Sequence, residues 1–173
     1  MGPTDKKKPK APADAEQKGS SGKYKKREVQ KKVSKTKARV INAEGSVFGR
    51  LASVVAKELL GGAEIVIVNA EKSIVVGSRE NILQEYKTAR ARGSRERGPY
   101  FPKRPDLILR RAIRGMLPHK AARGIDALSR LKIFIGVPEE YKSLKMEKIK
   151  EAQVARDRFM VLSEVSKEVG WAR

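Results

Sequence analysis

The chain has 173 residues, no cysteine, and 40 Lys or Arg against 20 Asp or Glu, which gives a formal net charge of +20 at pH 7. The lack of cysteine excludes disulfides, iron–sulfur clusters and thiolate zinc sites, and it fits a reducing interior. No apolar run approaches the roughly 18 residues of a membrane span, and the first residues lack the apolar stretch of a signal peptide. Such a basic chain favours nucleic acid as its partner, with an anionic membrane surface second.

Residues 1–38 differ in composition from the rest and are predicted to be a basic, low-complexity N-terminal extension. They are rich in Lys, Pro, Ala, Gly and Ser, and Val29 and Val33 are almost their only larger aliphatic side chains. Such a segment cannot bury enough apolar surface to offset its ordering entropy, so we expect it to be disordered in the free protein. Through Arg39 the segment carries fourteen basic and four acidic residues, a net charge of +10.

The globular core, residues 39–138, is predicted to begin as a strand–helix–strand unit. Residues 40–43 are predicted to form a strand, and Ser46 is expected to be the N-cap of a helix with an apolar face at Val47, Leu51, Val54, Val55 and Leu59. Gly61 and Gly62 should end this helix. The nearly continuous apolar run at 64–70 is typical of a strand covered on both faces, which indicates a parallel sheet. Residues 73–76 are predicted to form a third strand.

The second half of the core is predicted to contain three helices and a last strand. The first helix covers 79–91, and a loop over 92–105 follows it. Asp106 is expected to cap the next helix, in which the apolar stripe is Leu109, Ala112, Ile113, Met116 and Leu117 and three arginines lie away from it. A fourth helical stretch over 119–130 leads to a strand at 132–137.

Residues 139–173 are predicted to be a C-terminal extension of mixed charge. We expect an exposed helix over 141–157, a short strand at 158–162, and a terminal helix that stops at Gly170.

One stretch, residues 87–123, concentrates positive charge within the predicted core. It holds twelve Lys or Arg against the acids Glu96 and Asp106, a net charge of +10, and nine of the twelve are arginine. Arginine binds phosphate bidentately and stacks on bases, and Tyr100 and Phe101 lie inside the run. Charge held on folded elements repels itself unless a polyanion neutralises it, so the partner implied is nucleic acid.

Sequence motifs for other chemistry are largely missing. The segment GSVFGR at 45–50 has three residues between its glycines, where a phosphate-binding P-loop has four followed by Lys and Ser or Thr. Its glycines are interpreted as turn-forming, although Arg50 in the first turn of the helix can still contact a phosphate. His119 is the only histidine, and no catalytic set can be argued around it. Helix-turn-helix, zinc-finger and basic-zipper patterns are absent, as are the signatures of common single-strand RNA readers.

Three ordered motifs resemble the large-subunit ribosomal protein thirteen family, in its archaeal and eukaryotic type. They are VINAEGSVFGRLASVVAKELLGG at 40–62, EIVIVNAEKSIVVGS at 64–78, and RGMLP at 114–118, which precedes LKIFIGVP at 131–138. The resemblance covers about 40–138, and the extension at 1–38 departs from the compact family members. It implies a three-layer α/β/α fold with a four-stranded parallel sheet in the order 3-2-1-4. It also implies a cytoplasmic, structural role in the large ribosomal subunit, with rRNA bound early in assembly.

The hypothesis is therefore a non-enzymatic rRNA-binding protein that uses no cofactor and no metal. Its expected partners are large-subunit rRNA and neighbouring ribosomal proteins, and not DNA or membrane. A nucleotide- or RNA-acting α/β enzyme with a degenerate phosphate loop at 45–50 is the alternative, and a peripheral membrane protein driven by residues 1–38 is a third. The predicted RNA-binding residues combine the charge pattern with the family resemblance: Arg50, Arg90, Arg92, Arg95, Arg97, Tyr100, Lys103, Arg104, Arg110, Arg111, Arg114, His119, Lys120 and Arg123.

Overall fold

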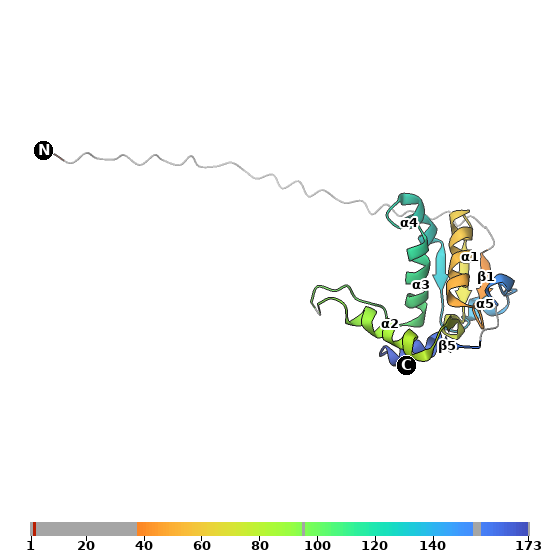
Figure 1. Ribbon diagram of the computed structural model, residues 1–173. Helices are drawn as coiled ribbons and strands as arrows, with labels where there is room; N and C mark the ends of the chain where they lie inside the picture. Colours follow the sequence, from red (N-terminus) through yellow and green to blue (C-terminus); the bar gives the residue numbers. More distant parts are fainter. Residues whose placement is uncertain (1, 3–37, 95, 154–156, 173) are drawn as a thin grey trace. The chain divides into compact units, whose positions relative to one another are not determined.

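A parallel sheet of three strands lies at the centre of the computed structural model, which describes residues 2, 38–94, 96–153 and 157–172 (Figure 1). The strands are β1 (Arg39–Asn42), β2 (Ile65–Val68) and β4 (Leu131–Ile133), in the order β1-β2-β4. β1 pairs with β2 from Arg39↔Ile65 to Asn42↔Val68, and all four residues of β2 are buried. The predicted parallel strand–helix–strand unit and the fully covered second strand are therefore confirmed.

The predicted four-stranded sheet in the order 3-2-1-4 is not confirmed among the described residues. β4 lies beside β2, and β3 (Ile74–Val76) pairs antiparallel with β5 (Phe159–Val161) in a separate two-stranded sheet. The local backbone explains the difference. Asn69 adopts a left-handed conformation with φ 55°, and the short helix η1 (Ala70–Lys72) turns the chain out of the sheet directly after β2. The peptide groups of Phe134 then bond Ile67 and Ala70, so the chain after β4 occupies that side of β2.

The main core lies between one face of the sheet and two long helices, α1 (Phe48–Leu60) and α3 (Pro105–Met116). Leu51, Val55 and Leu59 of α1 have no exposed surface, and neither do Leu109 and Ile113 of α3. Burying each such side chain stabilises the fold by roughly 1.5–3 kcal/mol relative to leaving it exposed. The helices α1 and α3 stand side by side, and α4 (Ala122–Ser129) packs at one end of them (Figure 1).

The opposite face of the sheet has a thinner cover. Its buried residues are Val40, Val66 and Val68, which alternate along the strands with the residues that face α1 and α3. Phe134, Tyr141 and neighbouring side chains pack on them. Of the described residues that cover this face, Tyr141 belongs to a helix, α5 (Glu139–Lys142), which has four residues. Of the predicted three layers, the third therefore consists of connecting chain and a single helical turn in the described structure.

The C-terminal segment enters the main core. Helix α2 (Arg79–Ala91), which has its predicted bounds, packs against α6 (Leu162–Glu168), and Leu162 and Val165 are fully buried. The predicted exposed helix over 141–157 is wrong, because only α5 and the short helix η2 (Lys150–Ala152) form there, and residues 154–156 lie outside the described range. The peptide of Glu147 instead donates to Val40 and accepts from Asn42, so this segment runs along the open edge of β1.

Several predicted details at element ends also need correction. Val47, not Ser46, is the N-cap of α1, and Ser46 is fully buried beneath the turn. Arg104, not Asp106, is the N-cap of α3, since Pro105 fits the first helical position. Met116, which was predicted to belong to the apolar stripe, is 45% exposed, whereas Ile108, which was not predicted to belong to it, is buried. The last strand and the fourth helix are shorter than predicted, at Leu131–Ile133 and Ala122–Ser129. The described part of the chain has no helix long and apolar enough to cross a bilayer.

Candidate nucleic-acid interface

Helix α3 holds three arginines in fixed positions on the side away from the core. Ile108, Leu109 and Ile113 are at most 2% exposed, and they fix the rotation of the helix about its axis. The three arginines of the same helix are all exposed: Arg110, Arg111 and Arg114. The predicted separation of apolar stripe and charged face is therefore present, and the guanidinium groups stand on a rigid support.

The loop between α2 and α3 is fastened to the helices through one aromatic side chain. The ring of Phe101 meets the ring of Tyr86 edge-on, with centroids 5.7 Å apart, and the guanidinium carbon of Arg111 lies 4.8 Å from the centre of the Phe101 ring. Such cation–π and edge-to-face contacts each contribute about 0.5–1.5 kcal/mol. The loop tip is closed by reciprocal backbone hydrogen bonds between Ser94 and Gly98. The loop is thus attached to the arginine face of α3.

Three basic loop residues that the structure describes are exposed, and so is Tyr100. Tyr100 is 70% exposed, and Arg92, Arg97 and Lys103 are exposed as well. Arg95 lies outside the described residues.

Two predicted arginines have partners within the protein. The Nη1 of Arg90 donates a hydrogen bond to the backbone carbonyl of Val169, so it ties α2 to the end of α6. Arg104 binds Asp106 through both carboxylate oxygens, with Nε to Oδ1 at 3.2 Å and Nη2 to Oδ2 at 3.0 Å. Asp106 partly neutralises the charge of Arg104. Arg90 and Arg104 therefore both have a structural role.

The turn after α3 presents three further predicted residues, His119, Lys120 and Arg123, all of them exposed. The turn is held by a close approach of backbone to backbone. A Cβ on Gly124 would lie 2.2 Å from the carbonyl oxygen of Pro118, so only glycine permits α4 to pack this closely under the turn. The side chain of His119 makes no hydrogen bond or ion pair with the described residues.

Arg50 is exposed in the first turn of α1, which packs against α3. The segment 45–50 does not form a phosphate cradle. Gly45 makes the turn with φ 70°, and the peptide N–H of Val47 donates to the carbonyl of Ala152 at 2.8 Å. The interpretation of these glycines as structural fits this geometry.

Two surface hollows bring the predicted residues together. One, of about 310 Å³, is lined by Tyr100 from the loop and by all three arginines of α3. The other, of about 580 Å³, brings Arg90, Arg92 and Lys103 together beside Tyr100. The predicted residues fall into separate groups and not one continuous pocket, because neither hollow includes Arg50, Arg97, Arg104, His119, Lys120 or Arg123. The leucines at 107 and 128 line the first hollow and were not predicted, because each lies on a different helix and no sequence pattern joins them.

Several cations outside this face are paired with acids of the same chain. Arg39 is bound by Glu58 and Glu147, Lys72 by Glu44, and Arg79 by Glu164 and Glu168. The two hydrogen-bonded acids raise the pKa of Arg39, against a smaller opposing effect of burial. Among the described residues no carboxylate lies within 4 Å of the guanidinium groups of the three α3 arginines. No group of three or more potential metal ligands occurs among the described residues either.

Comparison with known proteins finds the same family along most of the chain. A model of the family described as ribosomal protein L13 matches residues 36–140. The chain is 55% identical to large ribosomal subunit protein uL13 of Methanosarcina barkeri over 135 residues, which are 76% of this chain and 96% of the relative. It is 47% identical to the protein of the same name from Methanococcoides burtonii over 134 residues, again 76% of this chain and 96% of the relative. For the one from Archaeoglobus fulgidus the identity is 46% over 136 residues, 76% of this chain and 87% of the relative.

Proposed function

The chain belongs to the ribosomal protein L13 family, of archaeal type, and on this basis we propose that it is a non-enzymatic structural constituent of the large ribosomal subunit. In this role it binds large-subunit rRNA through the arginine face, by which we mean Arg110, Arg111 and Arg114 of α3 together with the basic loop at 92–104. Its partners are that rRNA and neighbouring proteins of the subunit, and neither DNA nor membrane.

The observation that carries the proposal is the lack of carboxylate partners for three arginines on a rigid helix. Arg39, Lys72 and Arg79 are examples of cations that are paired with acids of the same chain. The three α3 arginines have no acid of the described residues within ion-pairing distance, and they stand together within five residues of one helix. Unpaired, closely spaced cations destabilise a folded surface until an anion of matching geometry neutralises them. The phosphates of a folded RNA supply such charges in fixed positions, and arginine binds phosphate with paired hydrogen bonds.

The remaining predicted residues extend this proposal. Arg92, Arg97, Tyr100 and Lys103 come from the loop, His119, Lys120 and Arg123 from the turn and α4, and Arg50 from α1. All are exposed, so each can reach a phosphate or base without moving the core. Arg90 and Arg104 are proposed as RNA contacts only through donors that Val169 and Asp106 do not use.

The alternative of a nucleotide- or RNA-acting enzyme has no observation in its favour. Residues 45–50 form a turn and the start of α1, and the relatives named above carry ribosomal names. A structural role agrees with the family to which the chain belongs.

Binding to purified large-subunit rRNA over a range of salt concentrations tests the proposal. Because affinity is expected to come mainly from phosphate neutralisation, log K should fall by roughly 0.7–0.9 per contacted phosphate for each log unit of salt. The protein should also co-sediment with large subunits through a high-salt gradient. Affinity that is independent of salt, or equal affinity for an unrelated RNA of the same length, would argue against the proposal.

A further inference from the structure

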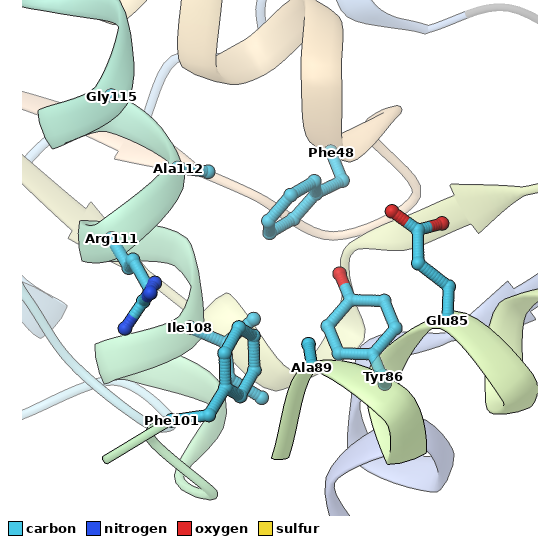
Figure 2. A pocket seen from close by; sticks show the side chains of 9 residues that line it. All are labelled: Phe48, Glu85, Tyr86, Ala89, Phe101, Ile108, Arg111, Ala112 and Gly115. Atoms are coloured by element: carbon cyan, nitrogen blue, oxygen red, sulfur yellow. The ribbon is translucent and has the colours of Figure 1, made fainter. Parts of the chain in front are cut away.

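A pocket of about 270 Å³ lies between α1, α2 and α3, and the predicted RNA contacts account for only one of its lining residues, Arg111. Three aromatic rings face it, from Phe48 of α1, Tyr86 of α2 and Phe101 of the loop (Figure 2). The exposed side chains of Glu85 and Arg111 stand at its edge, on opposite sides of the view. The pocket therefore combines apolar ring surfaces with one acidic and one basic group.

The rings offer surfaces on which a flat ligand can stack. Tyr86 and Phe101 meet edge-on at 5.7 Å, so only one of the two rings has a face covered by the other. The guanidinium of Arg111 already lies over the Phe101 ring at 4.8 Å, and this contact leaves its in-plane N–H groups available for an anion. Unpaired nucleobases bind proteins in this way, between aromatic side chains and arginine planes.

The polar groups of the pocket are one donor and one acceptor from adjacent residues. Burial, with a smaller effect of the Glu85 charge, raises the pKa of Tyr86 to about 12, so its hydroxyl stays protonated and able to donate. Glu85 forms no ion pair with the described residues, and its carboxylate can accept two hydrogen bonds. Figure 2 shows the Tyr86 hydroxyl and the Glu85 carboxylate at the end of the pocket nearest Phe48.

Resting on the rRNA-binding function proposed above, we propose that this pocket receives one unpaired base of the RNA and prefers guanine. The Watson–Crick edge of guanine carries two adjacent N–H donors beside a carbonyl oxygen. A carboxylate accepts from both donors, and a neighbouring hydroxyl donates to the carbonyl, so Glu85 and Tyr86 match that edge. Adenine and cytosine offer a single amino group next to an acceptor, and uracil offers one N–H between two carbonyls, so neither pattern matches a carboxylate as well.

Continuity with the arginine face favours a base over an apolar side chain of a neighbouring protein. Arg111 lines both this pocket and the adjacent hollow with Arg110 and Arg114. A nucleotide whose base enters the pocket therefore has its phosphate beside Arg111, and the chain can continue along the other two arginines. An apolar side chain would fill the ring-lined volume but would make no use of the Glu85 carboxylate and the Arg111 guanidinium at its edge.

The test measures binding of the full-length protein to four labelled pentanucleotides, UUGUU, UUAUU, UUCUU and UUUUU, by fluorescence anisotropy. A bidentate contact to a base gives about 5- to 150-fold discrimination, so UUGUU should bind at least about fivefold more tightly than UUUUU. Glu85→Gln should remove that preference without weakening UUUUU binding, because the amide has one acceptor and one donor. Glu80→Gln is the matched control, since it makes the same charge change on the same helix but outside this pocket, and it should keep the preference.

A second variant tests the pocket without removing any of its polar groups. A Cβ on Gly115 would have no atom within 4 Å, so a side chain can begin there without a clash, and Gly115→Leu adds bulk to the lining of the pocket. It should fold as the wild type does, as judged by thermal melting, and should reduce UUGUU binding to the UUUUU level. Equal binding of all four oligonucleotides by the wild type, or a guanine preference that survives Glu85→Gln, overturns the assignment. Because binding to large-subunit rRNA is measured separately, either result leaves the proposed ribosomal function standing.

Discussion

Replacing the three arginines of α3 with glutamine together is expected to weaken rRNA binding strongly while the fold stays intact. None of the three lies on the buried stripe, and glutamine has a helix propensity close to that of arginine. The main loss is the contact between Arg111 and the Phe101 ring, so stability should fall by only about 0.5–1.5 kcal/mol. The variant Arg110→Gln/Arg111→Gln/Arg114→Gln therefore isolates binding from folding.

The size of the effect follows from counterion release. If each arginine neutralises one phosphate, the slope of log K against log salt should become shallower by roughly 0.7–0.9 per arginine, or about 2 to 3 in total. The two proteins should have similar affinity when extrapolated to 1 M salt, where counterion release contributes nothing. At 0.1 M salt the triple variant should then bind about 100- to 500-fold more weakly.

Filter binding or anisotropy with large-subunit rRNA at several salt concentrations gives both numbers, and urea unfolding checks the fold. A second triple variant, Lys57→Gln/Lys132→Gln/Lys145→Gln, removes the same charge from exposed positions on α1, on β4 and after α5. It should lose much less affinity than the α3 variant. If both variants lose affinity equally, only the net charge matters, and the reasoning from the rigid arginine face is refuted.

Three further predictions follow from particular contacts. Gly124→Ala should destabilise the protein by about 1–3 kcal/mol in urea unfolding, because its Cβ would lie 2.2 Å from the Pro118 carbonyl oxygen; an unchanged midpoint would show that the turn can yield. Since the pKa of Tyr86 is raised to about 12 in the folded protein, the unfolded chain loses this proton first as pH rises above about 10. Wild type should therefore lose up to about 3 kcal/mol of stability relative to Tyr86→Phe between pH 10 and 12; parallel unfolding curves for the two proteins would contradict this. Deletion of residues 1–38 should leave most of the affinity for large-subunit rRNA in place, and complete loss of binding would favour the alternative driven by the N-terminal extension.

The elements with a strong local pattern could be predicted from the sequence. The run Ile65–Val68 is buried on both faces as its continuous apolar character indicates, and α2 spans Arg79–Ala91 as predicted. The arginines of α3 could be placed for the same reason, because a helical period separates them from Leu109 and Ile113.

Features that depend on contacts between distant segments could not be predicted. β3 has a strand-like sequence, but its pairing partner β5 lies more than eighty residues further along the chain, and no local signal points to it. The segment 141–157 has helical composition, yet the open edge of β1 binds Glu147 through its backbone instead. Such long-range choices override local propensity.

The candidate site shows the same division. The charge pattern and the family resemblance identified the exposed arginines, but they did not reveal that Arg90 binds the carbonyl of Val169 or that Arg104 binds Asp106. The aromatic pocket was also missed, because Phe48, Tyr86 and Phe101 come from three elements that are adjacent only in the fold.

A structure of the large ribosomal subunit that contains this chain tests the central claim most directly. The account predicts that the guanidinium groups of Arg110, Arg111 and Arg114 lie within hydrogen-bonding distance of rRNA phosphates, about 2.7–2.9 Å for charge-assisted pairs. It is contradicted if this face of α3 and the loop before it point into open solvent or pack only against other proteins.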